Sequence, residues 1–273
     1  MAKKRKKGFA LKIARLLWLL ISLILSIFLK AIKSTYFLVK NLVRGIGKKA
    51  KEIRAKKARP KIPASPKKLS VLKSLEGKFS EFEKSLAKSD STIGIVIGAR
   101  GSGKTAAALR ILENLHPSKK NLYSMGLRES DLPLWIKNVS EISKIKNNSF
   151  VLIDEGGILF SSRKSMSSAN KILSDLLLIA RHKNISVIFI SQNSSNLDIN
   201  ILRQADYLIL KKSSLLQKEF ERKIIRKIYE EISKDFKKFK TKRASYIYSS
   251  KFRGFVSFPL SSFWSQKVSK AFR

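Results

Sequence analysis

One stretch constrains this chain more than any other: Gly98-Ala99-Arg100-Gly101-Ser102-Gly103-Lys104-Thr105. It matches the pattern G-x-x-x-x-G-K-[ST] in full, and it lies between two segments of different character. Before it, residues 92–97 form an apolar, β-branched run, which predicts a buried strand. After it, residues 106–112 are strong helix formers with an apolar side. A strand, a glycine turn and a helix in this order predict a loop that wraps its backbone around phosphate oxygens.

The residues of this loop have distinct expected roles. The glycines let successive backbone N–H groups of residues 98–105 point inward, and the start of the helix adds its partial positive charge. Lys104 is expected to contact the β- and γ-phosphates of ATP, and the Thr105 hydroxyl is expected to ligate Mg²⁺. The sequence therefore predicts a site for ATP and Mg²⁺. A GTPase is not favoured, because the chain has no N-K-x-D motif for reading the base.

A second motif supplies the acidic groups that such a site needs. Residues 150–153 are apolar and are followed directly by Asp154 and Glu155. A buried strand of this kind delivers its two following carboxylates to the crevice at the carboxyl end of a sheet. Asp154 fits the residue that holds Mg²⁺, directly or through water. Glu155 fits the base that orients and deprotonates the attacking water.

A third motif is a helix that ends in a basic turn, followed by a strand and then by Gln192. A glutamine there can contact both the γ-phosphate and the attacking water, so its hydrogen bonds change when the phosphate leaves. A polar residue in a surface loop is the alternative. Arg181 lies at the opposite end of that strand and is predicted to reach a neighbouring subunit's site, as an arginine finger in trans. A solvated arginine or a DNA contact stays open for it, and Arg100, Arg163 and Arg203 are rivals for the finger.

Residues 91–210 alternate between strand and helix patterns, which predicts an α/β fold with a mostly parallel central sheet. Residues 126–148 connect these elements less regularly. The expected strands are 92–97, 121–124, 149–153, 186–190 and 207–211, and the expected helices are 104–115, 168–182 and 198–205.

The net charge of +39 is distributed unevenly along the 273 residues. Residues 1–68 hold 21 basic side chains against 1 acidic, and residues 211–273 hold 18 against 5, whereas residues 69–210 hold 19 against 13. A nearly balanced core with basic ends predicts a polyanionic partner: nucleic acid, an anionic membrane surface, or both. A lysine-rich composition without a partner is the alternative. The chain has no cysteine, which excludes disulfides and thiol catalysis.

Residues 1–47 combine a basic start with an uncharged apolar run from Leu16 to Leu29. As a helix this run would extend about 21 Å, less than the roughly 30 Å of a bilayer core, so its flanks must contribute for it to span. A single span, a shallow hairpin of 16–29 with 35–46, and a helix in the membrane plane stay open, and a buried soluble helix is the alternative. We expect a helical, membrane-associated segment, with the ATPase domain in the cytoplasm or associated with a virion.

The remaining segments frame the core. Residues 48–68 are rich in lysine and proline and predict an extended linker. Apolar residues at helical spacing over 69–88 predict an amphipathic lead-in helix within 69–90, before a core at 91–211.

The last segment, 212–273, begins with one apolar stripe from Leu216 to Phe239 on a long basic helix. It continues with an alternating aromatic pattern around 246–258, which predicts a hairpin. Aromatic side chains that stack on single strands are the alternative for this pattern.

Together, these motifs resemble the FtsK/HerA superfamily, a group of ring-forming, DNA-pumping ATPases. The resemblance covers about 91–211 and rests on the P-loop, the I-D-E strand, the block A-R-H-x-x-I-S-V-I-x-I-S-Q, and N-I-L-R-Q-A-D-Y-L-I-L. Small packaging ATPases of membrane-containing viruses and Zot-like morphogenesis ATPases of filamentous phages are the most similar groups. The resemblance implies a RecA-like P-loop NTPase fold and the roles given above for Asp154, Glu155 and Gln192. It also implies a homo-oligomeric ring, with a hexamer as the expected number of subunits.

Three functions follow from these features. The first is a membrane-associated, ring-forming ATPase that translocates double-stranded DNA, for viral genome packaging or DNA transfer. The alternative is a Zot-like ATPase that drives assembly or extrusion of filamentous virions at the membrane, with a virion or envelope protein as partner. The second alternative is a non-enzymatic tether between membrane and DNA. The intact Lys104, Asp154 and Glu155 argue against the tether.

Overall fold

The computed structural model describes residues 18, 25, 28–30, 33–47, 59–88, 91–118, 120–155, 166–239 and 241–269. The chain divides into two compact units, Met1–Lys57 and Ala58–Arg273. In the first unit residues 33–47 are helical and their side chains are exposed. Of the helices in the described ranges, none is both long enough and apolar enough to cross a membrane. Most of the predicted apolar run 16–29 lies outside the described residues.

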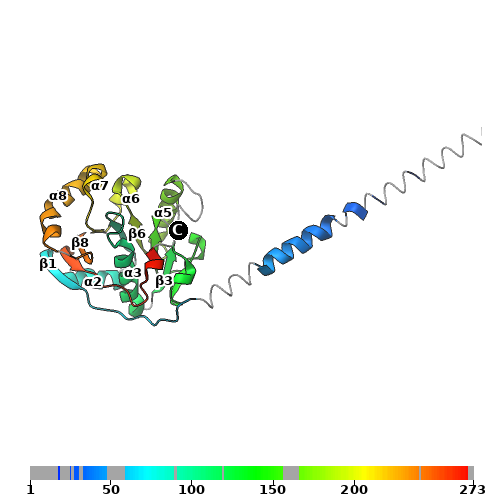
Figure 1. The fold of residues 1–273 in the computed structure, drawn as a ribbon, viewed down its shortest axis with the longest axis horizontal. Coiled ribbons are helices and arrows are strands. Elements are labelled where there is room, and N and C mark those ends of the chain that lie inside the picture. Colours follow the sequence, from blue (N-terminus) through cyan, green and yellow to red (C-terminus); the bar gives the residue numbers. More distant parts are fainter. Residues whose placement is uncertain are drawn as a thin grey trace, which may run out of the picture. The chain divides into compact units, whose positions relative to one another are not determined.

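The described strands of the second unit form one nine-stranded sheet in the order β1-β9-β8-β7-β2-β6-β5-β3-β4 (Figure 1). The six strands from β7 to β4 pair in parallel, and β8, β9 and β1 extend the sheet with antiparallel pairing. The strand bounds are β1 Ser70–Gly77, β2 Ile93–Ile97, β3 Asn121–Met125, β4 Ile136–Asn138, β5 Ser149–Asp154, β6 Ile185–Ser191, β7 Tyr207–Leu210, β8 Ala244–Ser249 and β9 Phe252–Ser257.

Helices cover both faces of this sheet. Buried side chains of α5, α6 and α8 pack on one face, and those of α2 and α3 pack on the other together with the C-terminal residues. β2 runs through the middle, with Ile95 and Ile97 in the first core and Val96 in the second. The helix bounds are α2 Phe79–Lys88, α3 Lys104–Leu115, α5 Met166–Ala180, α6 Ile199–Arg203, α7 Leu215–Phe220, α8 Lys223–Lys238 and α9 Gln266–Ser269.

The parallel part of the sheet matches the sequence-based prediction. All five expected strands are present, each within one residue of its predicted ends, and α3 has its predicted bounds. The C-terminal hairpin is also present as β8 and β9, and it continues the same sheet because β8 pairs with β7. Tyr246 and Phe255 are buried there, which favours the packed hairpin over stacking on single strands. The short β4 lies in the stretch that the sequence left irregular.

The prediction of one helix over residues 69–88 is wrong in its first half. Residues 70–77 form β1, an edge strand that pairs with β9, and only residues 79–88 are helical. Gly77 separates the two elements with φ of 71°, and a side chain at this position would collide with the Lys251 carbonyl. These residues form a strand, although their leucines have helical spacing, because β9 has an open edge whose backbone groups form hydrogen bonds with them.

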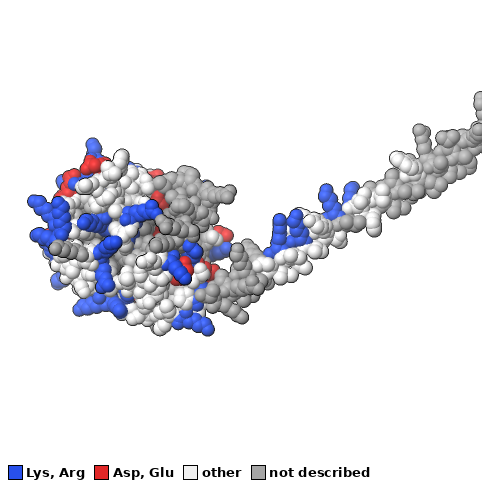
Figure 2. All heavy atoms as spheres, viewed as in Figure 1, with Lys and Arg blue, Asp and Glu red and all other residues white. Residues whose placement is uncertain are grey.

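The predicted long basic helix after the core is two helices. α7 ends at Phe220 and α8 begins at Lys223, with Glu221 and Arg222 between them. α8 is strongly amphipathic: all of its apolar side chains except Ile224 are buried against the sheet, and its lysines are exposed. Figure 2 shows lysine and arginine side chains gathered on the side of this unit where β1 and α8 lie.

The Lys/Pro-rich segment is extended as predicted over residues 59–67, and it packs against the rest of the second unit, to which it belongs. We call these residues the strap. Arg59 is 7% exposed, and its guanidinium donates to the carbonyls of Leu132, Pro133 and Ile136 and pairs with Glu129 at 3.1 Å. The start of this linker, residues 48–58, lies outside the described residues.

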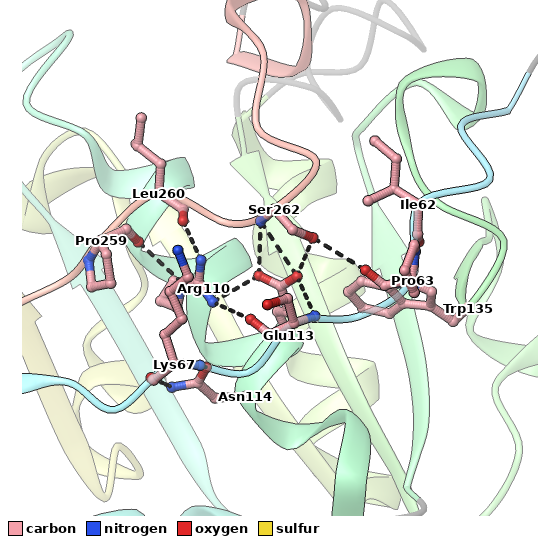
Figure 3. Close-up of polar contacts among 11 residues, drawn as sticks. Ile62, Pro63, Lys67, Arg110, Glu113, Asn114, Trp135, Pro259, Leu260 and Ser262 are labelled. Atoms are coloured by element: carbon pink, nitrogen blue, oxygen red, sulfur yellow. Dashed lines mark hydrogen bonds and ion pairs between the residues drawn. The ribbon is translucent and has the colours of Figure 1, made fainter.

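The strap and the C-terminal residues 259–262 meet on α3 at a buried ion pair (Figure 3). Arg110 and Glu113 are 2.8 Å apart, and both side chains are fully buried. Glu113 accepts hydrogen bonds from the backbone N–H groups of Ser65 and Ser262. Arg110 donates to the Ser65 carbonyl at 3.0 Å and to two carbonyls of the C-terminal residues. One charged pair on the helix that follows the P-loop therefore holds segments from both ends of the unit.

We expect Glu113→Ala to lower the free energy of unfolding by about 3–5 kcal/mol, because it leaves the Arg110 guanidinium buried without its counter-charge. Urea unfolding monitored by tryptophan fluorescence measures this loss. The matched control is Glu141→Ala, which removes an exposed pair with Lys144 and should cost less than about 1 kcal/mol. Equal losses in the two variants would contradict the anchoring role of the buried pair.

Candidate active site

The predicted site residues follow the carboxyl ends of adjacent parallel strands. The loop 98–103 follows β2, Asp154 and Glu155 end β5 and begin the next segment, and Gln192 follows β6. β6 lies between β2 and β5 in the sheet. Parallel pairing thus brings the three predicted motifs to one edge, where α/β sheets bind ligands.

The loop has the backbone geometry that the glycines predict. Gly101 and Gly103 have φ of 73° and 91°, and Gly103 caps the start of α3. Gly98 lies against Lys211, so a side chain at position 98 would collide with it. The loop is also tied to its neighbour, because Ala99 N–H donates to the Lys212 carbonyl at 3.2 Å. The loop is therefore held between two strands and the start of a helix.

Lys104 is folded back onto this loop. Its Nζ donates to the carbonyls of Gly98 at 2.7 Å and Ala99 at 3.0 Å, and the residue is 9% exposed. Burial lowers the pKa of this lysine to about 8, and the carboxylates of Asp154 and Glu155 act in the opposite direction. A phosphate group would offer the ammonium a stronger partner than two neutral carbonyls.

Thr105 and Asp154 form the part of the site that fits Mg²⁺. The Thr105 hydroxyl donates to Asp154 Oδ2 at 3.1 Å, so one hydroxyl and one carboxylate oxygen lie side by side at the start of α3. Mg²⁺ takes oxygen ligands and is commonly held by one or two protein groups together with substrate phosphates and water. The donor set fits: Thr105 and Asp154 would hold the ion, which neutralises charge on the phosphates when bound. Among the described residues no group of three or more His, Cys, Asp or Glu could hold a metal alone.

Glu155 has the environment of a general base. The residue is 4% exposed, and burial raises the pKa of its carboxyl above the ordinary value. Hydrogen bonds with the Ser191 hydroxyl and the Gln192 backbone act in the opposite direction, and the nearby charge of Asp154 adds to the increase. A carboxylate with a raised pKa accepts a proton from water more readily than an exposed one.

The other predicted residues are placed differently. Gln192 has an exposed side chain, and its carbonyl accepts a hydrogen bond from the Gln217 amide. Arg181 is exposed in the turn before β6, at the opposite end of that strand from Gln192, so its role in trans stays a prediction. Arg100 and Arg203 are also exposed, and Arg163 lies outside the described residues.

Lys211 is a buried residue of this region that the sequence reasoning missed. It directly follows β7, is 2% exposed, and its Nζ donates to the carbonyls of Lys242 and Ala244 at 2.7 and 2.9 Å. Burial lowers its pKa to about 7, with a smaller contribution from the charge of Lys104. The signal available in the sequence was its position: a lysine at the carboxyl end of a strand that neighbours the P-loop strand.

We expect Glu155→Gln to bind ATP and to lose turnover, because the amide keeps the size of the side chain but cannot accept the proton of water. Nucleotide binding by calorimetry and phosphate release measure the two properties. Normal turnover in this variant would contradict the assignment of the base.

The Glu155→Gln variant also tests Arg181. If Arg181 is an arginine finger that acts in trans, mixing inactive Glu155→Gln protein with inactive Arg181→Ala protein should restore some hydrolysis.

The affinity for a non-hydrolysable ATP analogue should fall as the pH rises above about 8, by up to about tenfold per pH unit, because phosphate binding favours the charged form of Lys104. Above this pH, binding should also take up a proton, which calorimetry in buffers of different ionisation enthalpy detects. An affinity that stays constant from about pH 7 to 9 would contradict the lowered pKa.

One family model matches part of the chain. The sequence model of the family "Zonular occludens toxin (Zot)" matches residues 129–214, a segment that includes β5, Glu155 and Gln192. No curated protein sequence matches the chain.

Solved structures resemble it at low identity. The genome packaging NTPase B204 of Sulfolobus turreted icosahedral virus 2, bound to AMP, has 16% identity and a TM-score of 0.44, over 63% of this chain and 99% of its own. The pCW3 conjugation coupling protein TcpA has 14% identity and a TM-score of 0.42, over 67% of this chain and 63% of its own. These values describe a likeness only. The chain's own P-loop and its Asp154–Glu155 pair make it a P-loop ATPase, and its residues 129–214 are similar to the Zot family.

Proposed function

We propose that this ATPase is a membrane-associated motor that translocates double-stranded DNA, in viral genome packaging or in DNA transfer. The observation that carries the proposal is the combination of a hydrolytic site with a strongly basic exterior. The ATPase site has a phosphate-binding loop, a pair of oxygens suited to Mg²⁺ and a buried base. The chain around it has a net charge of +39.

The basic surface suits a grip on the DNA backbone. The exposed lysines of α8 are Lys223, Lys227, Lys234, Lys237 and Lys238. Such side chains contact phosphates without reading base sequence, which is what a translocating protein needs. Buried residues such as Ile228 and Phe236 pack the apolar side of the same helix against the sheet, so the backbone that carries the lysines is held in place.

A ring is the assembly in which this site would work, and a hexamer is the number that the family resemblance implies. In such a ring the exposed Arg181 would contact the nucleotide of the next subunit. Gln192 would contact the γ-phosphate of its own subunit, and its hydrogen bonds would change when that phosphate leaves. ATP hydrolysis would then change the contacts between subunits while the basic side chains hold DNA.

The alternative is assembly or extrusion of filamentous virions at the membrane, with a virion or envelope protein as the partner. The match to the Zot family over residues 129–214 is the observation that favours it. A purely structural tether between membrane and DNA is not retained, because the chain is an ATPase.

We propose that the first unit binds the membrane and that the ATPase unit lies in the cytoplasm. Helix 33–47 exposes apolar side chains such as Phe37, Leu38 and Leu42, each more than 60% exposed, next to lysines. Apolar residues flanked by basic ones bind the interface of anionic bilayers.

Duplex DNA should stimulate ATP hydrolysis by the full chain, and the stimulation should fade as salt rises, because the proposed grip is electrostatic. The measurement compares phosphate release without DNA, with duplex and with single strands, and Lys104→Ala controls for contaminating ATPases. Hydrolysis that is indifferent to every nucleic acid would contradict the motor and favour the assembly function.

Deletion of residues 1–47 should release the protein from anionic liposomes and leave DNA-free hydrolysis nearly unchanged, because the ATP site lies wholly in the second unit. Flotation of both proteins with liposomes checks the first expectation. A deleted protein that still floats with the liposomes would contradict the proposed membrane segment.

A further inference from the structure

The loop that carries Gln192 is held by one buried carboxylate, that of Glu221. This residue lies between α7 and α8 and is 4% exposed. One of its oxygens accepts a hydrogen bond from the Ser194 N–H at 2.7 Å, and the other accepts one from Gln217 Nε2 at 2.9 Å. The same Gln217 amide also donates to the Gln192 carbonyl. Glu221 is therefore linked to both ends of the segment 192–194.

Arg222 holds the same loop through different atoms. Its backbone N–H donates to Ser194 Oγ at 2.9 Å, and its Nε donates to the Ser194 carbonyl at 3.1 Å. Its guanidinium also donates to the Leu197 carbonyl. Glu221 and Arg222 together thus form hydrogen bonds with the N–H, the carbonyl and the hydroxyl of Ser194. Glu221 and Arg222, which separate α7 from α8, therefore position the loop of residues 192–194.

Glu221 also acts on the phosphate-binding lysine. Its negative charge raises the pKa of Lys104, with smaller effect than the charges of Asp154 and Glu155. Burying a carboxylate costs free energy unless hydrogen-bond donors surround it. The donors to Glu221 are the Ser194 N–H, two residues after Gln192, and the Gln217 amide, which also contacts the Gln192 carbonyl. No step of the hydrolysis described above uses this carboxylate.

We propose that Glu221 is a positioning residue of the ATPase site, which fixes the loop that presents Gln192 to the γ-phosphate and the attacking water. This inference rests on the proposed role of Gln192. It gives the α7–α8 junction a function in the reaction: when the contacts of Gln192 change, the change passes to Gln217 and Glu221 by hydrogen bonds.

The test compares Glu221→Gln with Glu219→Gln in the full chain. At position 221 the amide keeps one acceptor oxygen and places a donor against either the Ser194 N–H or the Gln217 amide. Glu219 is exposed two residues away and pairs with Arg226 at 3.6 Å, so the control removes the same charge outside the network. The measurements are DNA-free kcat and KM, and the affinities for ADP and for a non-hydrolysable ATP analogue.

For Glu221→Gln we expect kcat to fall by at least about tenfold while the affinity for ADP changes by less than about twofold, because ADP lacks the phosphate that Gln192 contacts. Glu219→Gln should keep the kcat of the parent protein. A folded Glu221→Gln protein with unchanged kcat would overturn the proposal. So would an equal loss of ADP affinity and kcat, which is the result expected if Glu221 only stabilises the fold.

Gln217→Leu decides the question if Glu221→Gln does not fold. This change removes the amide that joins the Gln192 carbonyl to Glu221 and leaves the bond of Glu221 to the Ser194 N–H in place. It should lower kcat with ADP affinity retained, and an unchanged kcat would overturn the proposal. Because these rates are measured without DNA, they are independent of the test for DNA stimulation.

Discussion

The parallel pairing of β2 with both β6 and β7 is the constraint on which the site depends. It fixes where three strands end, and therefore where the P-loop, Gln192 and Lys211 lie relative to one another. β5 pairs with β6 in the same direction and adds Asp154 and Glu155 to that edge. The backbone ladder thus places the carboxyl ends of four neighbouring strands in one row, from β7 through β2 and β6 to β5.

The P-loop helix is anchored at its other end by a different kind of interaction. Arg110 and Glu113 are buried charges, and every oxygen or nitrogen that satisfies them comes from α3 itself, the strap or the C-terminal residues. Since a buried charge without partners is strongly unfavourable, these segments cannot detach without a large cost. The start of α3 is thus free to contact phosphate while its end is fixed.

The sequence predicted the parts of the fold that depend on local patterns. The bounds of α3 and of the parallel strands follow from apolar runs and from the glycine loop, which act within a few residues. β1 was missed because its partner β9 is far away in the chain, and because its leucines also fit a helical spacing. Glu221 was missed because a single charged residue carries no local signal, and Lys211 was missed because its position after β7 gains meaning only when β7 is known to pair with β2. Only the folded chain shows that both are buried beside the site.

The meeting of strap and C-terminus on α3 also orders the events of synthesis. Ser262 contacts Glu113 across 149 residues of sequence, and β1 pairs with β9 over a comparable separation. The P-loop, α3 and the Asp154–Glu155 pair leave the ribosome long before these partners exist. Until residues 259–262 have been synthesised, water must take the place of their backbone groups around Arg110 and Glu113, so this ion pair reaches its buried state only late in synthesis.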